Sequence, residues 1–307
     1  MRTAAKAVLP LFVLTAALFA QTAPAPAEFA THEGTLTLYT SLAPTESQPL
    51  AAAFEKKYGI KVQLWRGLSE EVVQRTITEA KGRRYTVDVI ETNGPEMEMI
   101  AREKLLAAPW SPDRLNLFVV GYNTTKVKRT DIPATYDGFT DPKWKGRIAL
   151  EATDSEWMAT LIKTLPNGMD LVRKLAAMQP ALRKGHVLLA SLVAAGEVPV
   201  GLAMYNSNIE SLKRKGAPID FVPVQPVVAR PQGIGVAKTA PHPNAARLFS
   251  EYVMSAEGQK LFESMGRTPA RTTSQSNSFR FTLIDPVTVL DESAKWEKVW
   301  NDLFVRR

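Results

Sequence analysis

The chain has 307 residues, no cysteine and a formal net charge of +7 at pH 7. Without cysteine it cannot be held by disulfides, so its stability must come from a buried apolar core, and attachment of lipid to a cysteine at a signal cleavage site is excluded. The basic residues are dispersed, with the densest cluster at residues 213–215. This pattern indicates a solvated helix face, argues against nucleic-acid binding, and weakly favours an anionic ligand.

The first residues predict a secretory signal peptide. Arg2 and Lys6 precede an apolar run of 14 residues at 7–20, and small residues and prolines follow at 21–27. The run is shorter than the roughly 20 residues that span a bilayer as a helix, so a membrane anchor is the weaker alternative. We expect cleavage between residues 20 and 27, which leaves a mature chain of roughly 280 residues, enough for two lobes.

The mature chain begins with the pattern of a βαβ unit. Leu36 and Leu38 alternate with polar residues over 35–40, which predicts a strand. A helix is predicted to open at Pro44 and to end at Gly59, a typical C-cap residue. Residues 60–65 alternate again, so the two strands should be parallel.

The same alternation of strands and helices continues along the chain. Ser69 is predicted to N-cap a helix with two glutamates in its first turn, and a strand at 87–90 precedes a loop at 91–95. Further strands are predicted at 116–122, 147–150, 198–204, 221–224 and 233–238, and helices at 155–164, 168–178 and 244–265. This order predicts an α/β fold with helices on both faces of the sheet.

Enzyme signatures are absent from the sequence. It contains no GxSxG, HExxH, Walker A or GxGxxG motif. The three histidines, His32, His186 and His242, are scattered without ligand spacing, and His242 lies between two prolines, which predicts a surface loop. We therefore expect neither a zinc site, nor a cofactor, nor catalytic activity.

Several segments in order resemble the iron-type cluster of periplasmic solute-binding proteins, within extracellular solute-binding protein family 1. They cover nearly the whole mature chain: LYTS at 38–41, FEKKYGIKV at 54–62, VDVI at 87–90, VVGYNT at 119–124, DPKWKGRI at 141–148, AGEVPVG at 195–201, HPNAARLF at 242–249 and SAEGQ at 255–259. This cluster includes receptors for ferric ion, phosphonates, thiamine and sugar phosphates. The DPKWKGRI block is the most distinctive of these motifs.

The resemblance implies a type 2 periplasmic-binding fold, in which two crossover strands join two lobes around a ligand cleft. The expected divisions are 1–27 for signal peptide and linker, 30–117 for the first part of lobe one, 118–230 for lobe two, 231–275 for the return to lobe one, and 276–307 for C-terminal tail helices. It also implies a monomer in the Gram-negative periplasm whose partners are a small ligand and an inner-membrane ABC permease.

Ligand-binding candidates follow from the fold class, because clefts in α/β lobes face the carboxyl ends of strands and the helix N-termini beside them. The candidates are Thr40, Ser41, Arg66, Ser69, Thr92 and Asn93 from lobe one, and Thr153, Asp154, Ser155, His186, Tyr205, Asn206 and Asn208 from lobe two. His186 is included because related receptors have a cleft-facing loop there. The alternatives are that Ser69 and Ser155 are only N-caps, that Tyr205 only packs, and that Arg230 is either an anion clamp or a surface charge.

The resemblance leaves the ligand open. Ferric-binding members use a neighbouring tyrosine pair, whereas this chain offers only Tyr205, and their additional histidine and glutamate are replaced by Ala43 and Asn93. We therefore expect a small polar, anionic solute. The alternatives are ferric ion bound through Tyr205 with a synergistic anion, a sensor partner of a membrane kinase and, more remotely, a secreted hydrolase or transferase.

Overall fold

The computed structural model describes residues 27–270 and 280–306. The predicted signal peptide, up to residue 26, and residues 271–279 therefore lie outside the described residues. Among the described residues, no helix combines the length and the apolar character needed to cross a membrane.

The first unit is the predicted βαβ unit. Strands β1 (Thr35–Thr40) and β2 (Lys61–Arg66) are parallel and flank helix α2 (Pro44–Tyr58). Pro44 occupies the first turn of α2, and Gly59 ends it with a φ of 71°, a left-handed conformation that glycine adopts without strain. A short helix, α1 (Ala27–Glu33), precedes the unit.

Two boundaries in the next unit differ from the prediction. Helix α3 (Ser69–Lys81) begins at Ser69 itself, so the predicted N-cap role of Ser69 is wrong. Leu68 holds the cap position, and its amide donates to the Glu71 carboxylate at 2.7 Å. Strand β3 (Val89–Asn93) runs through most of the predicted loop because its backbone pairs with strand β9, and α4 (Gly94–Arg102) follows at once.

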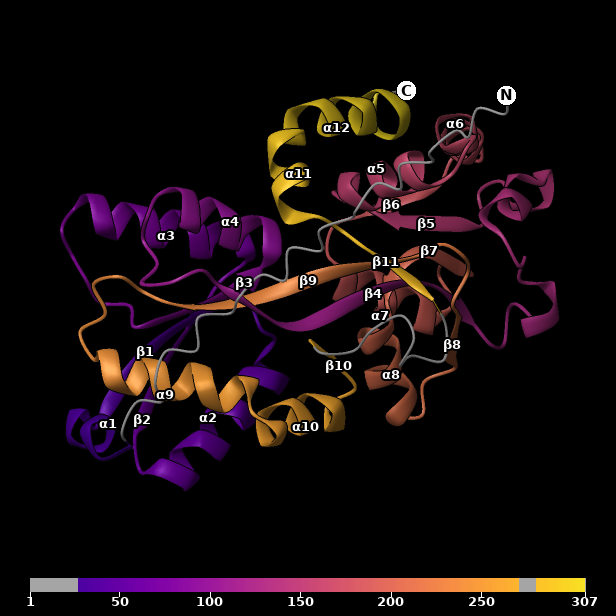
Figure 1. Cartoon of the computed structure of the whole chain (residues 1–307). Coiled ribbons are helices and arrows are strands. Elements are labelled where there is room, and N and C mark those ends of the chain that lie inside the picture. Colours follow the sequence, from indigo (N-terminus) through magenta and orange to yellow (C-terminus); the bar gives the residue numbers. More distant parts are fainter. Residues whose placement is uncertain (1–26, 271–279, 307) are drawn as a thin grey trace, which may run out of the picture.

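Two long strands connect the halves of the molecule. β4 (Ser111–Asn123) and β9 (Val227–Val236) are antiparallel, and the sheet order is β2-β1-β3-β9-β4-β7-β5-β6. β9 pairs with β3 of the first half and β4 pairs with β7 of the second, so the two crossover strands run between both lobes (Figure 1). The predicted lobe boundaries near residues 118 and 231 fall inside these strands and stay a prediction.

The second lobe alternates strands and helices. β5 (Ile148–Glu151), β6 (Ala181–Arg183) and β7 (Val200–Tyr205) are parallel neighbours, and β8 (Ile219–Val222) pairs with β4. The helices are α5 (Ser155–Thr164), α6 (Gly168–Ala177), α7 (His186–Ala195) and α8 (Asn206–Arg214). The sequence analysis predicted neither α7 nor α8 as a helix. In α7, apolar residues lie around most of the circumference, so the helical period of apolar residues cannot be recognised in the sequence.

Each lobe has its own apolar core. Phe54, Phe249 and Ile234 are buried in the first lobe, and Trp144, Trp157 and Leu202 in the second. Trp157 has no exposed surface, so it is a core residue and not a platform for ligand stacking. Leu36 and Leu38 of β1 are also buried, which explains why apolar and polar residues alternate along that strand.

The chain returns to the first lobe and then reaches across both. The helix predicted at 244–265 is two helices, α9 (Pro243–Met254) and α10 (Ala256–Ser264), because the Ser255 hydroxyl caps the second by accepting from the Gly258 amide at 3.2 Å. The strands β10 (Thr268–Pro269) and β11 (Phe281–Leu283) follow.

The C-terminal segment contacts both lobes. Helix α11 (Pro286–Asp291) lies against α4 of the first lobe, where Arg102 pairs with Asp291 at 2.6 Å. Helix α12 (Ser293–Trp300) lies against α5 of the second lobe, and the indole of Trp300 donates to the Ala152 carbonyl at 2.8 Å (Figure 1). A final turn, η4, spans Asn301–Val305.

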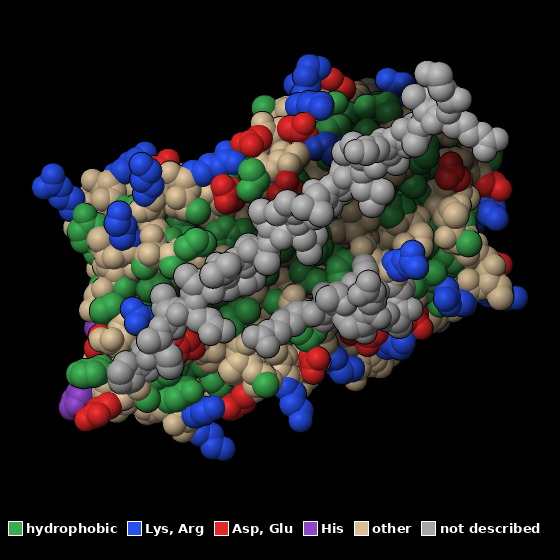
Figure 2. Space-filling view, viewed as in Figure 1, with side chains coloured by type: hydrophobic (Ala, Val, Ile, Leu, Met, Phe, Trp, Pro, Cys, Tyr) green, Lys and Arg blue, Asp and Glu red, His purple; other side chains and the backbone are tan. Residues whose placement is uncertain are grey.

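Charge is dispersed on the visible surface as the sequence suggests. On the face shown in Figure 2, Lys and Arg side chains are spread over both halves of the molecule without gathering into one patch. The basic cluster at residues 213–215 is exposed at the end of α8, where Lys213 pairs with Asp220 at 2.9 Å, as expected of a solvated helix end.

Candidate functional site

The carboxyl ends of the lobe-two strands bring a group of polar side chains together. Glu151 ends β5 and Tyr205 ends β7, while Asp154 stands at the cap position of α5 and His186 begins α7. Parallel strands place their carboxyl ends at one edge of the sheet, so these residues meet although they are up to 54 positions apart (151 to 205). With Glu156 and Arg230 they form what we call the Asp154 cluster.

Glu151 is fixed by three hydrogen bonds. One carboxylate oxygen accepts from the Gly185 amide at 2.8 Å, and the other accepts from the amide and hydroxyl of Thr153 at 2.5 and 2.7 Å. Burial raises the pKa of Glu151, but these bonds outweigh burial and hold the pKa below its usual value. Glu151 is therefore a buried, ionised carboxylate with a fixed orientation.

Asp154 and His186 form the centre of the cluster. The imidazole Nε2 lies 3.2 Å from one oxygen of Asp154, whose side chain is 1% exposed. Burial lowers the pKa of His186, but the nearby charges of Asp154 and Glu151 raise it above its usual value. The Tyr205 ring stacks on the imidazole with centroids 3.7 Å apart. This stack fixes the plane of the imidazole.

Arg230 joins the cluster to a crossover strand. It lies on β9, donates to the Tyr205 hydroxyl, forms an ion pair with Glu156, and approaches Asp154 to 3.6 Å. Burial, with the negative charges of Asp154, Glu151 and Glu96, raises the pKa of Tyr205 well above its usual value, so the phenol stays neutral. Of the two alternatives for Arg230, a surface charge is wrong, since Arg230 is 9% exposed.

Several buried atoms of the cluster have no hydrogen-bond partner among the described residues. They are Asp154 Oδ2, Glu156 Oε2, His186 Nδ1 and Arg230 Nε, and Oδ1 of Asn206, the residue after Tyr205, also lacks a partner. Buried polar atoms are normally satisfied, so such a concentration indicates groups that await a ligand. The cluster also holds three carboxylates against one guanidinium and one imidazole, which gives it acidic character.

Most of the remaining lobe-two candidates support the cluster. Thr153 orients Glu151 as described above, and Asn206 and Asn208 lie in the first turn of α8, directly after Tyr205. Ser155 is the first residue of α5, and Asp154 holds the N-cap position that was the alternative for Ser155. Arg267 forms an ion pair with Glu46 of α2 and donates to Ser207 of α8, and so connects the two lobes.

The lobe-one candidates are engaged differently. The Thr40 hydroxyl donates to Glu91 and accepts from the Leu42 amide at 2.9 Å, and the Ser41 amide donates to the Glu91 carbonyl at 3.1 Å. Arg66 is exposed at the end of β2.

The other three lobe-one candidates surround the starts of α3 and α4. Ser69 begins α3, Asn93 is the cap residue of α4, and the Thr92 hydroxyl is buried without a partner in the described part of the chain. The structure therefore brings Asp154, His186 and Tyr205 into one cluster and leaves the lobe-one candidates outside it.

The sequence analysis missed two acidic members of the cluster. Glu151 could have been noticed as an acid that ends an apolar strand, whereas Glu156 resembles any acid in a first helical turn. His242 lies in the bend before α9 with a side chain that is 31% exposed, and its Nδ1 is 3.0 Å from Asp88. His186 lacks sequence spacing to a ligand partner because the fold supplies the two carboxylates beside it.

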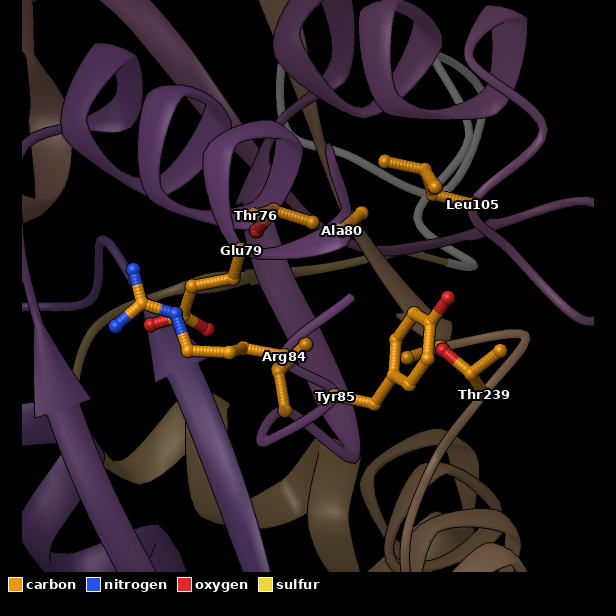
Figure 3. Close-up of a pocket in the computed structure, with 9 residues that line it drawn as sticks. Thr76, Glu79, Ala80, Arg84, Tyr85, Leu105 and Thr239 are labelled. Atoms are coloured by element: carbon orange, nitrogen blue, oxygen red, sulfur yellow. The ribbon is translucent and has the colours of Figure 1, made fainter. Parts of the chain in front are cut away.

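A pocket in lobe one offers little room. It lies between α3 and the loop residues Arg84 and Tyr85, with Leu105 and Thr239 on its other side (Figure 3). Its open space of about 20 Å³ is enough for about one water molecule. A solute larger than water therefore cannot enter it without displacing these side chains.

Comparison with known proteins agrees with the two-lobed architecture. The chain is 26% identical over 270 residues to iron uptake protein A1 of Synechocystis, covering 73% of this chain and 72% of that one. It is 23% identical over 244 residues to an Fe(3+)-binding periplasmic protein of Serratia marcescens, covering 68% and 70%.

Solved structures show the same fold. Iron-bound HitA from Pseudomonas aeruginosa superposes with a TM-score of 0.73 at 24% identity, covering 87% of this chain and 99% of that one. Residues 36–268 match the family described as bacterial extracellular solute-binding protein. Since that match covers most of the chain, the protein belongs to the bacterial extracellular solute-binding proteins.

Proposed function

We propose that this protein is the receptor of an ABC importer, which captures a small polar solute between its lobes and delivers it to an inner-membrane permease. Family membership supports binding without catalysis. The observation that carries the proposal is the Asp154 cluster, where buried polar atoms without partners lie beside the crossover strand β9.

The position of the cluster suits a receptor that signals its occupancy. Arg230 belongs to β9, which pairs with β3 in lobe one and β4 near lobe two, so a ligand that binds against Arg230 acts at the junction of the lobes. A ligand that contacts both lobes stabilises the closed form alone, and this differential affinity shifts the population toward closure. The permease then distinguishes the closed form from the open one.

The charge of the cluster favours a cargo that carries positive charge. Glu151, Asp154 and Glu156 are buried, and a buried carboxylate is stable only when a cation or hydrogen-bond donors compensate it. Three donors satisfy Glu151 and Arg230 pairs with Glu156, so Asp154, with one oxygen that has no partner among the described residues, is the least compensated of the three. A wholly anionic cargo, which the sequence led us to expect, would add repulsion here, so we propose a cargo with a cationic centre.

Ferric ion is the second candidate, because two relatives are named for iron uptake and ferric binding. In this chain it would have to use Tyr205 together with the carboxylates of the Asp154 cluster and an added anion. The Tyr205 phenol accepts a hydrogen bond from Arg230, which a ferric ion bound to the same oxygen would have to displace.

Native mass spectrometry of the protein purified from its own periplasm tests the proposal, paired with small-angle scattering before and after the cargo is removed. We expect mass spectrometry to find a bound small molecule or ion that the protein does not alter chemically. We expect the scattering profile to be more compact when this cargo is present. Asp154→Asn should lose the cargo, and His242→Gln, which alters a histidine–aspartate pair elsewhere, should retain it. Chemical turnover of the cargo, or identical scattering with and without it, would refute the receptor function.

A further inference from the structure

The Asp154 cluster contains a constellation with the chemistry of a metal site. Glu151, Asp154 and His186 each offer one ligand atom, and these atoms all lie within 4.8 Å of one another. We infer that these three residues bind a divalent first-row transition-metal cation. The inference rests on the proposed receptor function, because the cation would be the cargo or the part of it that contacts lobe two.

The distances are close to those of a bound ion. Carboxylate oxygen and imidazole nitrogen bind zinc at roughly 2.0–2.2 Å, so two ligand atoms lie about 3.4 Å apart at a tetrahedral ion and at most about 4.4 Å apart in any geometry. The more widely spaced ligand atoms of the cluster must therefore approach one another by up to about 1.4 Å when the ion binds. The 3.2 Å contact between His186 Nε2 and Asp154 Oδ1 shows that the first two ligands already approach each other.

A second observation points to a ligand independently of this spacing. Asp154 Oδ2 is buried and has no partner in the described part of the chain, although the Asp154 side chain is 1% exposed. A buried carboxylate oxygen without a donor is unfavourable by about 1–3 kcal/mol, and more when the group is charged. A cation bound to Asp154 removes this deficit.

The formal charges also match a divalent ion. The carboxylates of Glu151, Asp154 and Glu156 face one guanidinium, that of Arg230, which leaves two negative charges when the imidazole is neutral and the nearby Glu96, whose pKa is raised by burial, is protonated. A divalent cation cancels them, whereas a trivalent one leaves an excess. Carboxylate with imidazole suits zinc, manganese and ferrous iron, and the chain has no thiolate to favour softer ions.

The surrounding residues fix the ligands as supporting groups of metal sites do. Gly185 and Thr153 donate to Glu151 and so orient its carboxylate. Tyr205 stacks on His186 and limits rotation of the ring. Such contacts lower the entropy that is lost when an ion binds, and their removal typically weakens metal affinity by about 10–100-fold.

Calorimetric titration of the chelator-stripped full chain with Zn²⁺ and with Mn²⁺ tests the inference, and Co²⁺ absorption reports the ligand geometry. We expect one ion per chain, and a loss of affinity of at least about tenfold in each of Asp154→Asn, His186→Gln and Glu151→Gln. His242→Gln is the matched control, because it removes the imidazole of the other histidine–aspartate pair and should leave the titration unchanged. Thermal unfolding of each variant verifies that it is folded.

Four results would overturn the metal site. The first is the absence of any heat of binding with both ions, and the second is equal affinity in wild type and the folded His186→Gln variant. A visible phenolate-to-iron absorption band that requires Tyr205 would likewise assign the ion to a different ligand set. An organic ammonium cargo recovered with closure, but without metal binding, would refute the metal site and leave the receptor function intact.

Discussion

The molecule holds two buried polar clusters, and they differ in how far solvent reaches them. In lobe one, Arg114 pairs with Glu91 at 2.6 Å and with Asp113 at 2.8 Å, and these three side chains are at most 4% exposed. In the Asp154 cluster, the side chains of His186 and Arg230 are 13% and 10% exposed. The lobe-one group is sealed inside the protein, whereas the Asp154 cluster reaches the surface.

This difference shows that a polar residue at the end of a strand is not by itself a binding residue. Thr40 ends β1 and so satisfies the position rule as well as Asp154 does, yet its hydroxyl bonds to Glu91 and to the backbone amide of Leu42. The Asp154 cluster combines partial exposure with four buried atoms that have no partner among the described residues. Two buried atoms of the lobe-one group, Asp113 Oδ1 and Arg114 Nε, also lack a partner there, so accessibility is what distinguishes the candidate site from the structural network.

Removing the arginine of each cluster should give the largest contrast between them. Arg114→Met leaves Glu91 and Asp113 as buried carboxylates without a cation, so we expect the free energy of unfolding at pH 8 to fall by about 3–5 kcal/mol. Arg230→Met should lower it by only about 1–3 kcal/mol, because Asp154 keeps its contact with His186 and removal of the partly exposed guanidinium opens the cluster to water. Urea denaturation of both variants measures the difference.

We attribute the predicted loss of stability in Arg114→Met to the missing charge and not to the change in side-chain volume. The control is therefore Arg114→Lys. A lysine keeps the cation but cannot reproduce the two contacts of the guanidinium, and it should recover part of the loss. Equal losses for Arg114→Met and Arg230→Met would contradict the distinction between a sealed and a reachable cluster.

The sealed cluster should also make stability depend on pH. Burial raises the pKa of Asp113 from 3.8 to about 7, with Arg114 opposing the shift and Glu91 adding to it. Between about pH 4 and pH 7 the folded chain therefore holds a proton that the unfolded chain has released, and the contribution of Asp113 to stability falls as pH rises through this window. Asp113→Asn removes this loss.

Denaturation of wild type and Asp113→Asn at pH 4.5 and pH 8 measures the effect. We expect the variant to gain stability relative to wild type between the two values, because asparagine cannot ionise. Comparing the two chains at each pH cancels the titration of other groups, His186 included. A difference between the chains that is the same at both values would show that Asp113 does not titrate in this window.

The extent of successful prediction reflects how local each signal is. The βαβ unit from Thr35 to Arg66 was predicted with small errors, because side-chain alternation, Pro44 and Gly59 are local features. The extension of β3 through Glu91 was missed, since it depends on pairing with β9, which lies about 140 residues later. Sequence alone could not reveal the Asp154 cluster as a unit.

The site candidates were also predictable only where the signal was local in the sequence. Asp154, His186 and Tyr205 were each identified as single residues at element ends or from the family resemblance. Their convergence with Glu151, and the position of Arg230 on a crossover strand, depend on how the sheet is assembled. The acidic balance that favours a cationic cargo became visible only after the three carboxylates were placed together.

Tyr205→Phe should have the smallest effect and separates the two cation hypotheses. The phenylalanine ring retains the stack on His186 and the contact with Phe118, whose centroid lies 5.0 Å from that of Tyr205, so only the hydroxyl that accepts from Arg230 is lost. We expect the free energy of unfolding to fall by about 1 kcal/mol.

If Glu151, Asp154 and His186 hold the cation, the Zn²⁺ affinity of Tyr205→Phe should fall by less than about tenfold, the lower end of the loss typical of supporting contacts. A ferric site built on the phenol would instead lose its visible band and its iron entirely. Calorimetry with Zn²⁺ and absorption with Fe³⁺ on the same preparation distinguish these outcomes, and a complete loss of Zn²⁺ binding would assign the Tyr205 hydroxyl to the ligand set.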